Sequence, residues 1–113
     1  MFKTTEAAGG WVINEKEEYL LIYNRNRWTL PKGGVEWREP VEEAAKREVM
    51  EETGIQTVEL LGEFIKTYHT FRRRRKWVLK VTHWYNMRGS SQEEMVPQAD
   101  EKIEDATWMS KKQ

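Results

Sequence analysis

The segment between Pro40 and Gly54 carries the signals of one amphipathic helix. Proline fixes its own backbone torsion where a helix can begin, and glycine supplies the left-handed residue on which helices commonly end. Between these limits, apolar side chains recur at every fourth position, as Val41, Ala45 and Val49. Since helical residues four positions apart lie above one another, they form a single stripe. The chain must therefore fold so that a core packs against one face of this helix.

Charges on this helix are distributed unevenly. Glu48 and Glu52 lie one turn apart, and neither has a lysine or arginine three or four positions away. A like-charge pair of this kind should cost about 0.2–0.5 kcal/mol. The other acids of the helix have a cation at that spacing: Lys46 for Glu42, and Arg47 for Glu43 and Glu51. Divalent cations prefer oxygen ligands, so this acidic stripe, with no cation at helical spacing, indicates a metal site.

Alternating and aromatic-rich patterns predict strands around the helix. The expected strands are, in chain order, residues 6–14, 19–24, 57–70, 76–87 and 103–109. Residues 25–30 fit a connector or a short strand, and residues 31–34 are expected to form a loop. We expect Trp77 and its alternating neighbours, as well as Trp108, to meet the core. These elements predict an α/β fold, with a mixed sheet and one long helix in a single domain, residues 1–113.

Composition excludes several classes of protein. The chain has 113 residues, the size of one domain, and its 19 basic residues balance 19 acidic ones, so overall charge favours no particular partner. The absence of cysteine excludes disulfides and thiolate chemistry. No apolar run approaches the roughly 18 residues of a membrane span, and no signal peptide is visible. We therefore expect a soluble, cytoplasmic protein.

A spaced motif runs through the helix and the loop before it. Its fixed positions are Gly33, Glu39 after five residues, Arg47-Glu48-Val49 after seven more, then Glu51-Glu52 and Gly54-Ile55. At every one of these positions the chain resembles the sequence box of the Nudix hydrolases. Residues 28–33 and 103–108 also look like family segments, so the resemblance covers roughly residues 7–108.

The resemblance implies an enzyme that cleaves a pyrophosphate bond in a nucleoside diphosphate linked to another moiety, with water attacking phosphorus. It implies an α/β/α sandwich that uses Mg²⁺ or Mn²⁺. The implied metal ligands are Glu48, Glu51, Glu52 and the backbone carbonyl of Lys32. Arg47 would orient Glu51, while Glu39 would brace the loop. Since magnesium lowers the pKa of bound water and offsets phosphate charge, this chemistry suits a diphosphate.

The general base is left open by this resemblance. Glu52 is one candidate for the base, and Glu48 and Arg47 are the other helix residues in the implied catalytic set. In some family members the base instead lies in the loop before the last strand, where Glu93, Glu94 and Glu101 are available.

Substrate contacts are expected from cations outside the box. The candidates are Arg25, Arg27 and Lys32 before the box, and Arg72 and Arg74 in the basic run 72–76. Arginine forks suit phosphate oxygens, although exposed surface arginines and a solvated hairpin tip are the alternatives. We expect a phosphorylated, nucleotide-like small molecule, such as a dinucleoside polyphosphate or diphosphoinositol polyphosphate, rather than a nucleic acid or a membrane.

Two further expectations concern class and assembly. A non-catalytic module that binds a nucleotide or RNA is the alternative to an enzyme, but such relatives typically have eroded boxes, and this one is intact. Family domains usually continue after the last strand into a helix that covers the sheet. The chain ends soon after Trp108, so we expect that helix to be missing and a homodimer to cover the face.

Overall fold

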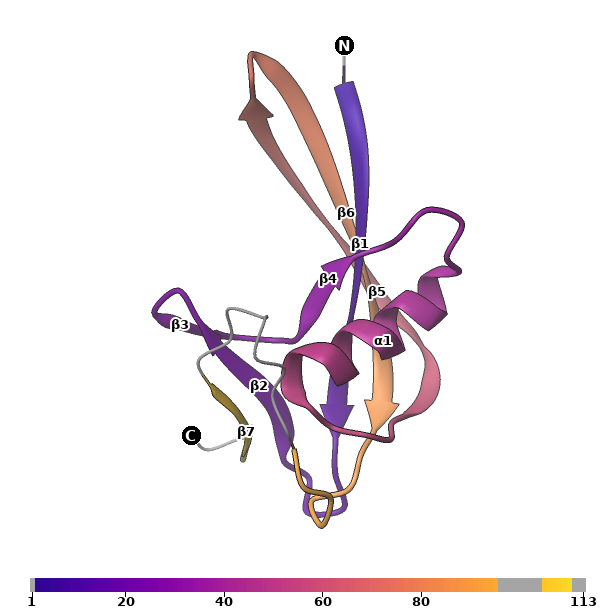
Figure 1. The fold of residues 1–113 in the computed structure, drawn as a ribbon, viewed down its shortest axis with the longest axis vertical. Coiled ribbons are helices and arrows are strands. Elements are labelled where there is room, and N and C mark those ends of the chain that lie inside the picture. The colour runs from indigo at the N-terminus through magenta and orange to yellow at the C-terminus, as the bar shows by residue number, and fades with distance from the viewer. Residues whose placement is uncertain (1, 96–104, 111–113) are drawn as a thin grey trace.

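The computed structural model describes residues 2–95 and 105–110, which form a branched sheet with a helix on one face (Figure 1). Its elements are, in chain order, β1 (Phe2–Ile13), β2 (Tyr19–Asn24), β3 (Arg27–Thr29), β4 (Lys32–Gly34), α1 (Val41–Thr53), β5 (Glu59–Arg73), β6 (Lys76–Arg88) and β7 (Asp105–Met109). The mixed sheet and the helix packed on it confirm the expected α/β fold. The described residues contain no second helix, and α1 is too short and polar to span a membrane.

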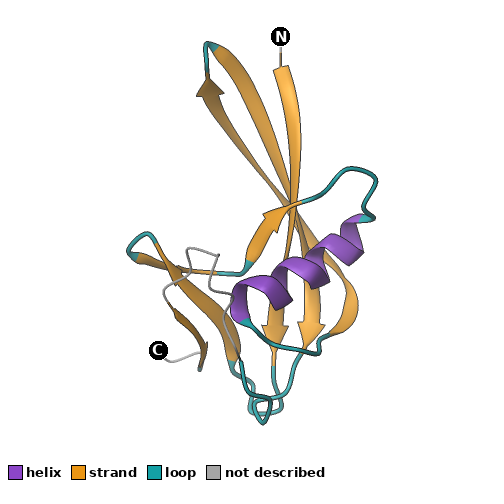
Figure 2. Cartoon of the chain, viewed as in Figure 1, coloured by secondary structure: helices purple, strands orange, loops and turns teal. Residues whose placement is uncertain are grey.

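The sheet is mixed because β1 and β6 are parallel while its other pairs are antiparallel. Its order is β3-β2-β1-β6-β5, with β4 paired to β1 and β7 paired to β2. The pair β1–β2 is registered only at Ile13 and Tyr19, so the two strands diverge from this point. As Figure 2 shows, the sheet opens like a fork, with β4 between its two branches.

Helix α1 has the predicted limits and the predicted buried face. It begins after Pro40, and Gly54 ends it at φ 81°, where its N–H donates to the Met50 carbonyl at 2.9 Å. Ala45 and Val49 are fully buried. A Cβ atom on Gly10 would lie only 2.8 Å from the Val49 side chain, so glycine lets the helix pack closely on β1.

One predicted core position is wrong. Tyr85 and Met87 are buried beneath α1, but Trp77 at the other end of β6 is 48% exposed. The 13 residues of the helix span about 20 Å, whereas the 13 residues of β6 span about 43 Å. The helix therefore covers less than half of the strand. Trp108 is partly buried against the core, as expected.

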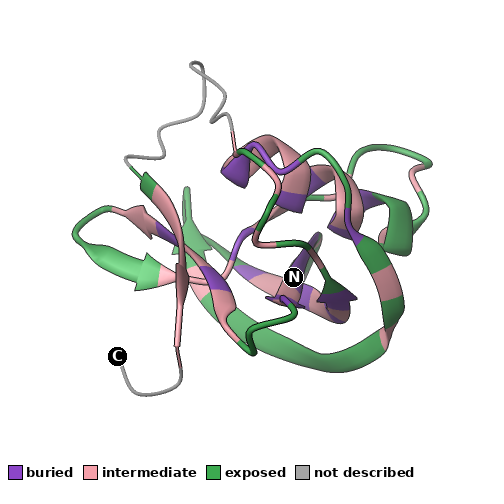
Figure 3. Ribbon diagram, turned by 90° about the horizontal axis from the view of Figure 1, so that it is seen from below, coloured by how far each residue is buried: buried purple, intermediate pink, exposed green. Residues whose placement is uncertain are grey.

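Beyond the helix, β1, β5 and β6 continue as a three-stranded arm, made of residues 3–7, 67–73 and 76–82 (Figure 1). Its edge strand β5 is exposed along most of its length (Figure 3). The expected loop at residues 31–34 is also wrong, because Lys32–Gly34 pairs with β1 as β4. This pairing fixes the segment that precedes the helix against the sheet.

Candidate active site

Arg47 is the centre of a charge network on the helix. Its guanidinium binds both carboxylate oxygens of Glu39, with Nε–Oε2 at 2.7 Å and Nη2–Oε1 at 2.9 Å. Nη1 donates to Glu48 at 3.0 Å and to Glu51 at 3.1 Å, and Nη2 donates to the Gly34 carbonyl at 3.0 Å. These contacts bind the box loop to the helix.

The network corrects the expectation that Glu48 has no cation in reach. Arg47 comes directly before Glu48 in the sequence. Helical spacing considers partners three or four positions apart, because the Cα–Cβ bonds of adjacent residues point in different directions around the helix. The long arginine side chain nevertheless reaches the Glu48 carboxylate. The acidic stripe is therefore held by an arginine on one side, and it is not a row of isolated charges.

Glu48 is also enclosed by the backbone of β4. The residue is only 8% exposed, and a Cβ atom on Gly33 would lie 2.1 Å from its carboxyl carbon. Only glycine leaves room for the carboxylate at this position. Gly33 thus allows β4 to pack directly against the buried carboxylate of Glu48.

Glu52, one turn after Glu48 on α1, lines a cleft of about 440 Å³. The cleft is lined by Ile22, Asn24, Arg25, Arg27, Thr29, Leu30, Lys32, Glu52 and Lys80. Arg25 belongs to the two-residue turn between β2 and β3, where it and Asn26 have φ of 52° and 65°. The cleft therefore brings together one predicted catalytic acid and three of the predicted substrate-binding cations.

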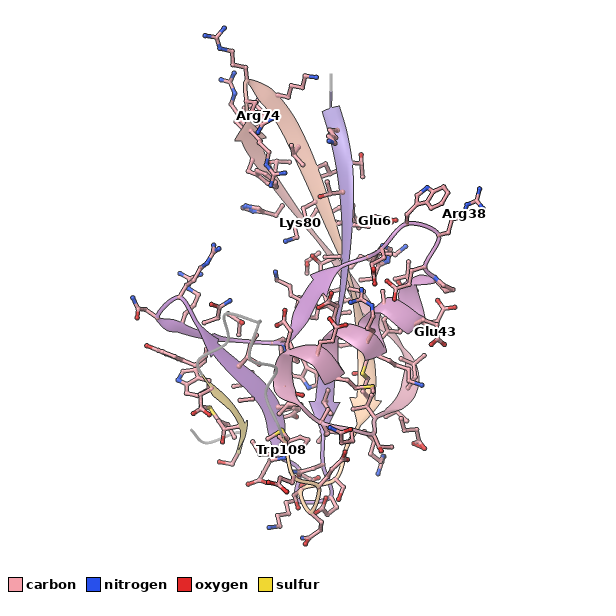
Figure 4. The ribbon with its side chains drawn as sticks, viewed as in Figure 1. Glu6, Arg38, Glu43, Arg74, Lys80 and Trp108 are labelled. Carbon is pink, nitrogen blue, oxygen red and sulfur yellow. The ribbon has the colours of Figure 1, made fainter. Side chains whose placement is uncertain are left out.

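Other predicted site residues lie elsewhere. Glu51 lines a separate hollow with Arg47 and Met50, and Arg74 lies at the end of the arm (Figure 4). Arg72 is exposed beside Trp77, with its guanidinium 5.6 Å from the ring. Neither arginine lines the cleft.

The alternative bases of the loop before β7 are placed only in part. The carboxylate of Glu93 accepts a hydrogen bond from the backbone N–H of Gln56, just after the helix, and Glu94 is exposed. Neither of them lines the cleft. Glu101 lies outside the described residues.

Lys80 belongs to the site although it was not among the residues predicted from the sequence. Its side chain lines the cleft and lies on the opposite side of the arm from Glu6 (Figure 4). Burial lowers the pKa of Lys80, and the nearby charges of Lys32 and Arg73 lower it further. The available signal was a cation within the otherwise apolar run Trp77–Val81.

The donor chemistry of this region fits a hard divalent cation. The carboxylates of Glu48 and Glu52 offer the oxygens that Mg²⁺ prefers. In residues 2–95 and 105–110, however, no group of three acidic or histidine side chains could hold a metal ion alone. Magnesium is commonly bound by one or two carboxylates, water and substrate phosphates. The residues therefore fit an ion that shares its coordination shell with a phosphorylated ligand.

Comparison with known proteins identifies the family. The model of the NUDIX domain matches residues 3–113. An RNA pyrophosphohydrolase of Caulobacter vibrioides is 35% identical over 92 residues, covering 72% of this chain and 53% of that protein. The chain thus spans about half the length of this relative.

Two solved structures share the fold at 20% identity. One is a Nudix hydrolase of Clostridium perfringens, with a TM-score of 0.72 over 97% of this chain and 83% of that one. The other is a C. elegans Ap4A hydrolase in a binary complex, with a TM-score of 0.70 over 94% of this chain and 80% of that one. With a matching domain model, an intact box and the same fold, the chain belongs to the Nudix family.

Proposed function

We propose that the chain hydrolyses a pyrophosphate bond in a nucleotide-like substrate, with a divalent metal ion as cofactor. One observation carries this proposal. Of the described residues that line the cleft, Glu52 is acidic, while Arg25, Arg27, Lys32 and Lys80 are cationic. Cations that converge on a cleft concentrate anionic ligands there. A carboxylate among them supplies a group that can hold a metal ion or accept a proton.

Each group has a defined role in this proposal. Arg25 and Arg27 bind phosphate oxygens, and the cleft orients the scissile bond towards Glu52. Glu48, Glu52 and the carbonyl of Lys32 would hold the divalent ion together with phosphate oxygens of the substrate, and Glu51, which lines a separate hollow, is a further candidate ligand. The ion would lower the pKa of a bound water and offset charge on the leaving phosphate. Arg47 keeps Glu48 and Glu51 in position through hydrogen bonds.

Glu52 is the proposed general base, because among the described residues it is the acid that lines the cleft. It takes a proton of the attacking water as the water oxygen bonds to phosphorus, while the bridging P–O bond breaks and the other phosphate group leaves with the bridging oxygen. Glu101 is the alternative base. A loss of turnover in E101Q that is larger than the loss in E52Q would favour Glu101.

A polyphosphate suits the four cations of the cleft better than a single phosphate does, since each arginine can bind two oxygens. The relatives are named for RNA and for Ap4A, so both kinds of polyphosphate end belong among the candidates. Mg²⁺-dependent phosphate release should be measured on nucleoside triphosphates, dinucleoside polyphosphates, nucleotide sugars, inositol pyrophosphates and a 5′-triphosphorylated oligoribonucleotide.

The decisive variant is Glu52→Gln, which keeps the size of the side chain and removes its charge. We expect a loss of roughly a thousandfold or more in turnover, with an unchanged thermal transition. Glu42→Gln is the matched control, because Glu42 is exposed on the same helix and does not line the cleft. Equal turnover in E52Q and wild type would refute the site.

The non-catalytic alternative makes a different prediction. A sensing module would bind these ligands without releasing phosphate at any metal concentration. The intact acidic residues of the box support the enzyme.

A homodimer is a separate proposal. The face of β5 carries exposed apolar side chains, including Phe64 and Ile65 at about half exposure. A second copy could cover them. Sedimentation that shows only monomer across a broad range of concentrations would refute this proposal.

A further inference from the structure

One face of the arm carries cations and aromatic rings. Paired residues of neighbouring strands lie on the same face, and side chains alternate along each strand. The pairs Arg73–Lys76, Phe71–Val78 and His69–Lys80 of β5 and β6 therefore share a face, joined by Lys3 and Thr5 of β1. We call these eight residues the cationic face. None of them is acidic.

Part of this face is hollowed into a groove. The groove has a volume of about 380 Å³ and is lined by Lys3, Thr5, Arg73, Arg74, Lys76 and Val78. No ion pair to these cations is found within residues 2–95 and 105–110. The groove therefore presents uncompensated positive charge.

The turn at the end of the arm places two arginines in backbone conformations that are unfavourable for them. Arg74 and Arg75 form the two-residue connection between β5 and β6, and their φ angles are 52° and 68°. Hairpin turns of this kind favour Asn-Gly, because both residues need positive φ. Strained positions of this type often accompany function, and two arginines here place positive charge beside the groove.

The cationic face continues into the cleft through Lys80. This residue lines the cleft and lies close enough to Arg73 and Lys32 to be affected by both charges. From Lys76 to Lys80 the strand rises about 13 Å. A ligand that contacts both the groove and the cleft must therefore be an extended anion.

Aromatic rings accompany the cations. His69 is exposed and stacks on Phe71 with ring centroids 5.9 Å apart, and the Arg73 guanidinium lies 5.3 Å from the Phe71 ring. Further along, Trp11 and Trp84 line an apolar pocket of about 260 Å³ that shares Leu30 with the cleft. Sites for single-stranded nucleic acid combine these features, a cationic groove for phosphates and aromatic rings for bases.

We propose that the cationic face of the arm binds a single-stranded nucleic acid, whose phosphorylated end then occupies the cleft. The first part stands on the arm alone. The second part rests on the proposed hydrolase function. A phosphorylated end held in the cleft would be the substrate, and the arm would select a nucleotide chain over a free nucleotide.

The first test uses binding alone. A labelled twelve-residue oligoribonucleotide with a 5′-hydroxyl end, and its DNA counterpart, are titrated by fluorescence anisotropy at several salt concentrations. Because this probe has no terminal phosphate, the result is independent of hydrolysis. We expect R73E/K76E to weaken binding at least tenfold. Removing two phosphate contacts should also reduce the slope of log K against log salt by about 1.4.

The matched control reverses two lysines elsewhere. Lys16 lies in the turn after β1, and Lys66 faces away from the cationic face in the pairing with His83. K16E/K66E changes the net charge equally and should bind within twofold of wild type. Thermal melting verifies that both variants fold. Equal binding of the oligonucleotides by R73E/K76E and wild type would overturn the proposal. Binding of anionic phospholipid vesicles by wild type, with no binding of either oligonucleotide, would also overturn it.

The second test links the arm to turnover. For a 5′-triphosphorylated oligoribonucleotide, R73E/K76E should raise KM at least tenfold, while kcat/KM for a nucleoside triphosphate stays unchanged. If binding depends on the arm but neither the oligonucleotide nor the nucleoside triphosphate is hydrolysed, the surface stands and the hydrolase function fails. An equal loss on both substrates would overturn the role of the arm in selection.

Discussion

Arginines in two regions of this molecule have opposite surroundings. On the helix, Arg47 contacts the carboxylates of Glu36, Glu39, Glu48 and Glu51 within 3.2 Å. On the arm, Arg73 and Arg74 face a groove, and no ion pair to either is found among the described residues. The same type of side chain thus has a structural role on the helix, whereas on the arm its charge is available to a ligand.

This difference teaches how a neutral chain can hold a polyanion. The 19 acidic and 19 basic residues cancel in number, but the acids gather around α1 while cations gather on the arm and in the cleft. Net charge therefore conceals a separation of charge in space. The expectation that nucleic acid is not a partner did not take this spatial separation of charge into account.

Replacement of Arg47 should have the largest effect on stability. R47A leaves the buried Glu48 without its arginine and releases Glu39 from a two-point contact. We expect a loss of about 3 kcal/mol in the free energy of unfolding, the lower end of the range for broken buried pairs, since Arg47 is partly exposed. Urea denaturation measures this. K46A, at the neighbouring position, should change stability by less than about 0.5 kcal/mol.

The pH dependence of the same variant sharpens the result. Hydrogen bonds from Arg47 and from the Glu36 N–H lower the pKa of Glu39 below 4.5. A lowered pKa in the folded state gives stability that is complete above the unfolded pKa and is lost as pH falls through the folded value. Wild type should therefore lose stability below about pH 4.5 more steeply than R47A. Parallel curves would show that the pair does not stabilise the fold.

Two adjacent glycines of β4 offer the next test. A methyl group at Gly33 would overlap the Glu48 carboxylate, whereas at Gly34 it would meet no atom within 4 Å. We expect G33A to cost about 2 kcal/mol and to impair hydrolysis, because Glu48 must move. G34A should change neither property measurably. If both variants behaved alike, the close contact between β4 and Glu48 would have no consequence.

The smallest expected effect concerns the turn of the arm. R74N/R75G replaces two strained residues with the pair that favours positive φ. It should raise the free energy of unfolding by about 1 kcal/mol while weakening oligonucleotide binding. A variant that is more stable and binds equally well would show that the arginines of the turn are dispensable.

Local signals account for what the sequence predicted well. The limits of α1 follow from Pro40 and Gly54, which act within one turn of the chain. Its buried face follows from spacing alone. The strands of the β5–β6 hairpin could be predicted from alternation, although the two arginines of its turn are not typical turn residues.

Contacts between distant segments account for what was missed. Lys80 lines the cleft only because β6 pairs in parallel with β1 and places it beside Lys32. Trp77 is exposed because a strand of the same residue count is more than twice as long as a helix. The pairing of Arg47 with Glu48 depends on a side chain that reaches sideways, which spacing rules along a helix do not consider.

Isothermal titration of Mn²⁺ or Mg²⁺ tests most directly whether Glu52 and the cationic cleft act together on a phosphorylated ligand. The titration is run with and without a non-hydrolysable polyphosphate nucleotide, on wild type and E52Q. We predict saturable metal binding to wild type that strengthens at least tenfold when the nucleotide is present, and no such strengthening in E52Q. Identical binding curves for the two proteins would contradict the account.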